Sequence, residues 1–120
     1  MVLKMRDEVK QMAKVFKALG EPTRLRIIKI LASEGGYFCV GALAKKLGIS
    51  QPAASQHLKV LKEAGILDSK RMGYHVHYYV DAETFKIHKE KINELMEKAF
   101  EKRRGSKNGK CLHPSKEKKT

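Results

Sequence analysis

Two short helical patterns separated by a tight turn constrain the fold of this chain most. The first pattern covers residues 41–47, and the second follows Ser50 and runs to about Ala64. Gly48-Ile49 between them is typical of a tight turn, and Ser50 is a favourable N-cap with Pro52 in the first helical turn. A helix, a glycine-containing turn and a second helix in this order predict a helix-turn-helix.

The segment that follows the second of these helices is typical of a β-hairpin. Ile66-Leu67 begins a strand, Lys70 to Gly73 is expected to be a basic turn, and residues 74–80 alternate like a return strand. The expected fold is therefore a winged helix-turn-helix, mainly α-helical with a small β-hairpin. A basic turn beside the second helix fits a contact to the phosphate backbone or the minor groove of DNA.

Three further helices are expected around this unit. The first covers about residues 4–19, the second opens at Glu21-Pro22-Thr23 and ends at Gly35-Gly36, and the last runs from Asp81, its cap, to about Arg103. We expect one domain over residues 1–104 that both binds DNA and dimerises, because a domain this small gains core by pairing. Residues 105–120 are too polar to fold alone and are expected to be a disordered basic tail.

The charge of the chain favours a polyanionic partner. The net charge is +13, of which +7 falls in residues 102–120, where eight Lys and Arg face one Glu. Such a balance predicts salt-sensitive phosphate contacts, although lysines also keep proteins soluble. Paired carboxylates, a nucleophile with a base, and a phosphate loop are all missing from the sequence, so an enzyme is not expected.

The location expected from the sequence is the cytoplasm. No run approaches the roughly 18 apolar residues of a membrane helix, so no membrane partner is expected. The N-terminal stretch MVLKMRDEVKQ lacks the apolar segment of a secretory signal. Two cysteines 72 positions apart, Cys39 and Cys111, do not make a disulfide framework and fit a reducing compartment.

The second helix of the helix-turn-helix has an apolar side and a small, polar side. Ala54, Leu58 and Leu61 cluster on the apolar side at 100° per residue. Glutamine can pair with adenine through two hydrogen bonds, and serine can bond base edges or phosphate. The residues expected to read bases are Gln51, Ser55 and Gln56, and those expected to contact the DNA backbone are Ser50, His57, Lys59, Lys70 and Arg71.

Three blocks of this sequence resemble the ArsR/SmtB family of transcriptional regulators. Residues 16–27, FKALGEPTRLRI, are similar to its opening motif, and residues 50–61, SQPAASQHLKVL, to its recognition helix. Gly65-Ile66-Leu67 and Arg71-x-Gly73 match its wing, so the resemblance covers about residues 13–80. It implies a homodimer joined through the first and last helices, and usually a repressor that an effector releases from its operator.

The sequence departs from this family at the sensor. Where many members carry Cys-Val-Cys, this chain has Cys39-Val40-Gly41, and the last helix lacks the family's zinc ligands at residues 82–84 and 95–98. One thiolate cannot supply the ligands that such ions require, so the family's usual sites predict no metal cofactor here. Cys39, Cys111 and His113 are weak candidates for a metal site, and the two thiols for a redox pair. The alternatives are that Cys39 is a buried core residue and Cys111 an idle thiol in the tail.

The three remaining histidines carry weaker signals, and two other functions stay open. His75 and His77 have ligand-like spacing but are expected to face solvent or DNA, and His88 is expected at an interface. The favoured function is a sequence-specific regulator of double-stranded DNA that binds a pseudo-palindromic operator as a dimer. The alternatives are a non-specific architectural DNA-binding protein and a winged helix that binds another protein.

Overall fold

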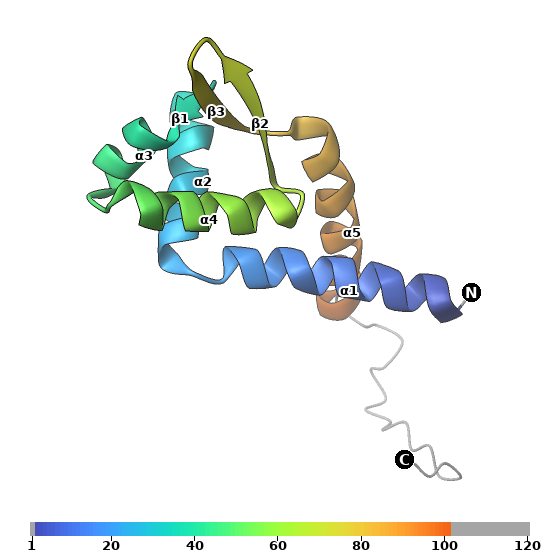
Figure 1. Cartoon of the computed structure of the whole chain (residues 1–120). Coiled ribbons are helices and arrows are strands. Elements are labelled where there is room, and N and C mark those ends of the chain that lie inside the picture. Colours follow the sequence, from blue (N-terminus) through green and yellow to red (C-terminus); the bar gives the residue numbers. More distant parts are fainter. Residues whose placement is uncertain (1, 102–120) are drawn as a thin grey trace, which may run out of the picture.

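The computed structural model describes residues 2–101, with side chains described from Asp7 onward. Within this range the chain forms five helices and three strands (Figure 1). In chain order they are α1 (Val2–Leu19), α2 (Pro22–Glu34), β1 (Phe38–Cys39), α3 (Val40–Leu47), α4 (Gln51–Glu63), β2 (Leu67–Met72), β3 (His75–Val80) and α5 (Ala82–Phe100). None of the helices in this part of the chain is long and apolar enough to cross a membrane.

The predicted helix-turn-helix is confirmed as α3, a short turn and α4. Gly48 ends α3 with a φ of 71°, a left-handed conformation that glycine adopts without a steric penalty. Ser50 caps α4, because its hydroxyl oxygen accepts a hydrogen bond from the Ala53 amide at 3.2 Å. Asp81 caps α5 in the same way through the Thr84 amide, as the sequence predicts.

The sheet contains one strand more than the predicted hairpin. Its antiparallel order is β1-β3-β2, and Phe38 and Cys39 of β1 pair with Tyr78 and His77 of β3. A strand of two residues is too short to show an alternating pattern, so it left no signal in the sequence. The extra strand joins the wing directly to the start of α3.

The predicted position of the wing's turn is wrong. Lys70 and Arg71 lie within β2 and pair with His77 and Val76, and the last pair before the turn joins Met72 to His75. The turn is therefore Gly73-Tyr74, and Gly73 has a φ of 69°, which suits the two-residue turns of twisted hairpins. Lysine and arginine resemble turn residues in a sequence, but their long side chains are equally suited to an exposed strand.

The core lies where α1, α2, α3, α4 and β2 meet. Its largest fully buried side chains are those of Ile27, Leu43, Leu58, Leu61, Ile66 and Val15. In Figure 1, α4 crosses the view between α1 below and the wing above, and α5 runs down one side. No residue of α5 is fully buried, and the helix ends at Phe100, short of the predicted Arg103, which lies outside the described residues.

Candidate nucleic-acid interface

The polar face of α4 is exposed and its apolar side is fixed in the core. Ala54, Leu58 and Leu61 have no exposed surface. On the other side Gln51, Ser55, Gln56 and Lys59 are all exposed, so the structure brings these four candidates together on one helix. A rigid helix that presents small polar side chains outward fits the width of a DNA major groove.

Gln51 rests against the start of α3. A Cβ atom built on Gly41 would lie only 3.3 Å from the side-chain nitrogen of Gln51. Glycine at position 41 therefore leaves the space that the amide of Gln51 occupies. The side-chain amide of Gln51, the base-reading candidate nearest to the N-terminus of α4, therefore lies beside the first turn of α3, although the residue as a whole is exposed.

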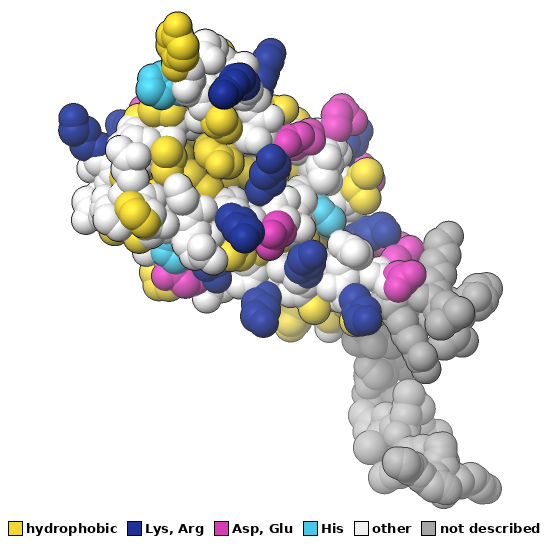
Figure 2. Space-filling model, viewed as in Figure 1, with side chains coloured by type: hydrophobic (Ala, Val, Ile, Leu, Met, Phe, Trp, Pro, Cys, Tyr) yellow, Lys and Arg dark blue, Asp and Glu magenta, His cyan; other side chains and the backbone are white. Residues whose placement is uncertain are grey.

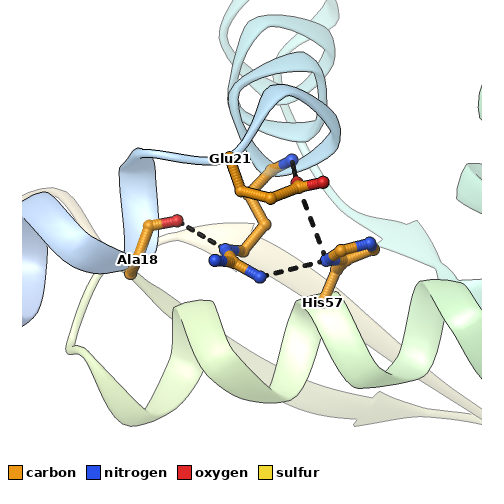
Figure 3. A network of polar contacts seen from close by, with 4 residues as sticks. Ala18, Glu21 and His57 are labelled. Carbon is orange, nitrogen blue, oxygen red and sulfur yellow. Dashed lines mark hydrogen bonds and ion pairs between the residues drawn. The ribbon is translucent and has the colours of Figure 1, made fainter.

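His57 lies on the flank of α4 that faces the junction of α1 and α2 (Figure 3). Arg24, in the first turn of α2, donates from Nε to the Ala18 carbonyl at the end of α1. Its Nη1 lies 3.2 Å from Nδ1 of His57. The Arg24 amide donates to Oε1 of Glu21 at 2.9 Å, and this carboxylate lies 3.8 Å from Nδ1 of His57. These four residues form a clamp that links α1 and α2 to the middle of α4.

The clamp determines which nitrogen of His57 carries a proton. An arginine side chain can only donate, so Nδ1 of His57 accepts and the proton of the neutral ring sits on Nε2. The hydrogen bond from the Arg24 amide, as the largest cause, holds the pKa of Glu21 below its ordinary value. Desolvation opposes this shift, while the charge of Arg24 adds to it, as does the charge of His57 when its ring is protonated. His57 is half-buried beside the packed side of α4, and the parts played by Glu21 and Arg24 were not predicted.

The wing presents basic side chains along one strand and an aromatic side chain at its apex. Lys70 and Arg71 are exposed on β2, and Nζ of Lys62 donates to Ser69 Oγ at 2.7 Å, which ties α4 to the wing. Tyr74, at the turn, is 97% exposed. Its place at the apex was missed, because the sequence pattern assigns Tyr74 to the return strand. The signal was its position directly after a glycine that suits a two-residue turn.

Cys39 ends β1 and immediately precedes α3. It is half-buried rather than fully buried, and its side chain makes no capping hydrogen bond within the described chain. Its cross-strand partner His77 is also half-buried, whereas His75 is exposed as expected. Residues 2–101 contain no group of three side chains able to hold a metal ion. Cys111 and His113 lie outside the described residues.

His88 lies half-buried on α5 and contacts the region where α4 ends. A Cβ atom built on Gly65 would lie 3.1 Å from its Nε2. His88 also lines a hollow between α5 and α1, together with Met12 and Ile87. This histidine therefore packs within the chain, at the junction of the first and last helices.

Comparisons with known proteins agree with this architecture. A family model described as "Bacterial regulatory protein, arsR family" matches residues 21–69. The chain is 42% identical over 74 residues to the uncharacterized HTH-type transcriptional regulator MJ1325 of Methanocaldococcus jannaschii, covering 62% of this chain and 82% of that protein. It is 39% identical over 67 residues to the transcriptional repressor SdpR of Bacillus subtilis, covering 56% and 72% respectively.

A solved structure shares the fold over most of its length. The homodimeric winged helix-turn-helix DNA-binding domain of Mb0332 from Mycobacterium bovis superposes with a TM-score of 0.64 at 26% identity, covering 83% of this chain and 92% of that one. The fold and the exposed face of α4 define a winged helix-turn-helix transcriptional regulator. The chain belongs to the ArsR family of such regulators.

Proposed function

We propose that this protein is a homodimeric repressor that recognises a pseudo-palindromic operator in double-stranded DNA. The observation that carries the proposal is the face of α4, where polar side chains are exposed opposite a fully buried apolar side. Relatives whose names identify them as repressors support the direction of control: SdpR and the arsenical resistance operon repressor of Escherichia coli. Two α4 helices would enter successive major grooves, with half-sites about 10–11 bp apart or a multiple of it.

The proposed roles of the side chains follow from their positions. Gln51, Ser55 and Gln56 read base edges from the exposed face of α4. Lys59, Lys70 and Arg71 contact phosphates, as does the Nε2 proton of His57 that the clamp fixes. The Ser50 hydroxyl accepts the cap bond of α4 and still has its own proton to donate to a phosphate. At the apex of the wing, Tyr74 contacts the sugar edges of the minor groove.

Dimerisation through α1 and α5 is proposed from their exposed apolar side chains. Val9 of α1 is 62% exposed, and Phe100 of α5 is 79% exposed. Three more large apolar side chains of α5 are exposed: Ile87, Leu95 and Met96. Covering these side chains requires a second chain, and the Mb0332 domain is homodimeric. The basic segment 105–120 would add electrostatic affinity without sequence preference.

The test begins with selection of a preferred duplex from a random library by the full chain. On the selected site, Gln51→Ala and Gln56→Ala should each cost roughly 1–3 kcal/mol of binding free energy, with little change on random DNA. Gln11→Ala is the matched control, because Gln11 is an exposed glutamine on α1. Equal losses on selected and random duplexes, or no selected site at all, would favour a non-specific architectural protein instead.

We also propose that any thiol-based sensing acts through Cys39. Cys39 lies two positions before Gly41, and the side-chain amide of Gln51 lies beside Gly41. A change at the thiol can therefore reach a proposed base-reading residue through the start of α3. The experiment measures operator affinity for wild type, Cys39→Ser and Cys111→Ser, each reduced, oxidised and with zinc. An oxidation response that Cys39→Ser abolishes supports the proposal, and identical affinities in all nine samples eliminate it.

A further inference from the structure

A row of three lysines follows one exposed face of α1. Lys10, Lys14 and Lys17 are spaced by four and three residues, so they fall within about 60° of one another around the helix. All three side chains are exposed. We name this row the α1 lysine ridge. A positive charge in the last turn of a helix stabilises the helix dipole, which accounts for Lys17 but not for the other two.

None of the three ridge lysines forms an ion pair with a carboxylate within residues 7–101. The ion pairs formed by lysines in this range involve Lys46 with Glu34 and Lys91 with Glu8. Glu8 is on α1 itself, but its carboxylate lies 3.3 Å from Lys91 of α5 and is therefore directed away from the ridge. The ridge thus presents three positive charges to solvent.

The α1 lysine ridge and the polar face of α4 belong to one surface. Figure 2 shows Lys and Arg side chains over α4 and in a row along α1 on the same face of the molecule. The two helices are held together by the buried Val15 and Ala18 of α1 and by the clamp from Arg24 to His57. In Figure 1, α4 lies between the wing and α1, so a DNA duplex placed across α4 would have the wing on one side and α1 on the other.

The exposed apolar side of α1 places the ridge relative to a second copy. Val9 and Phe16 are 62% and 40% exposed, and they lie about 100° around the helix from the lysines. If this side packs against the partner, the ridge stays uncovered beside the dimer interface, near the two-fold axis. The lysines of both copies then face the DNA segment between the two half-sites.

We propose that Lys10, Lys14 and Lys17 bind the DNA phosphate backbone between the half-sites of the operator, an inference that rests on the proposed function. The interaction is electrostatic and independent of sequence, since lysine recognises a phosphate as a point charge. It extends the interface of each protomer beyond the wing and α4 to a third element.

The test compares two variants that remove the same charge. In the first, the three ridge lysines are changed to glutamine; in the control, Lys86, Lys89 and Lys98 of α5, which are also exposed, are changed to glutamine. For the operator selected by the wild type, the slope of log affinity against log salt should become shallower by about 0.9 for each phosphate that is no longer neutralised, or by about five for the six ridge lysines of a dimer. The control should change the slope by about one or less. Single substitutions of the ridge lysines give the same comparison with one charge removed from each protomer, or two from the dimer.

A second measurement locates the interaction on the DNA. Operators with neutral methylphosphonates between the half-sites should bind the wild type more weakly than unmodified operators do. For the ridge variant, the modified and the unmodified operators should bind equally well. Equal salt slopes for the two variants, or equal weakening of both by central methylphosphonates, would overturn the inference. If the wild type selects an operator but the expected differences between the two variants are not found, the inference fails and the proposed function stands. A wild type that selects no operator refutes the proposed function itself.

Discussion

The side chain of Arg24 is predicted to contribute more to stability than any other exposed or half-exposed cation in the described chain. It donates to the Ala18 carbonyl, which lies in the last turn of α1, where carbonyl groups have no partner within the helix. It also donates to Nδ1 of His57. The perturbation is Arg24→Met, which retains most of the aliphatic stem and removes both donors.

The expected magnitude follows from the groups left unpaired. A hydrogen bond from a charged donor is worth roughly 1.5–3 kcal/mol, and an unsatisfied buried acceptor costs about 1–3 kcal/mol. Since Arg24 and His57 are only half-buried, we take the low end and expect a loss of about 2–3 kcal/mol in the free energy of unfolding. For a domain of this size such a loss lowers Tm by roughly 10 °C or more.

The assay is thermal and urea unfolding at one fixed protein concentration, because the stability of a dimer depends on concentration. Arg26→Met is the matched control: Arg26 is exposed two residues along the same helix and makes no side-chain hydrogen bond within residues 7–101. The control should change stability by less than about 0.5 kcal/mol. If both variants unfold alike, the clamp does not stabilise the junction of α1, α2 and α4, and the reasoning is refuted.

Three further predictions concern Glu21, Gly41 and the basic segment 105–120. Because the folded-state pKa of Glu21 is lowered, its stabilising effect is present above the unfolded value of about 4.3 and is lost as the pH falls below it, so Glu21→Gln should flatten the acid limb of a stability–pH curve. Gly41→Ala should preserve thermal stability but weaken operator binding, since the new methyl group displaces Gln51; unchanged binding would contradict this. Deleting residues 105–120 removes five lysines and should make the salt dependence of binding shallower while an in vitro selection returns the same consensus.

Local signals in the sequence were sufficient for the helices and for the face of α4. Ser50 and Asp81 cap α4 and α5 as predicted, because a short polar side chain at a helix start acts through neighbouring amides only. The burial of Ala54, Leu58 and Leu61 follows from helical spacing, which also depends on near neighbours alone.

Features that depend on residues far apart in the chain could not be predicted. Strand β1 exists because Phe38 and Cys39 meet β3 about forty residues later, and neither residue carries that information itself. The clamp joins Arg24 to His57 across 33 positions. The wing's turn is a different failure: Lys70 and Arg71 are polar enough for a turn, and only the pairing with β3 shows that they belong to a strand.

Gly41 stands where many members of the family have a sensor cysteine, and it lies beside Gln51, a proposed base-reading residue. In the family that this sequence resembles, many members carry a second cysteine here, whereas this chain has glycine. Any side chain at this position would meet Gln51, because a Cβ atom would lie 3.3 Å from the amide nitrogen. A side chain at position 41 and the amide of Gln51 in its present position therefore compete for the same space. In the proposed function Gln51 reads a base edge, so a change at the start of α3 is expected to act on it as a direct neighbour.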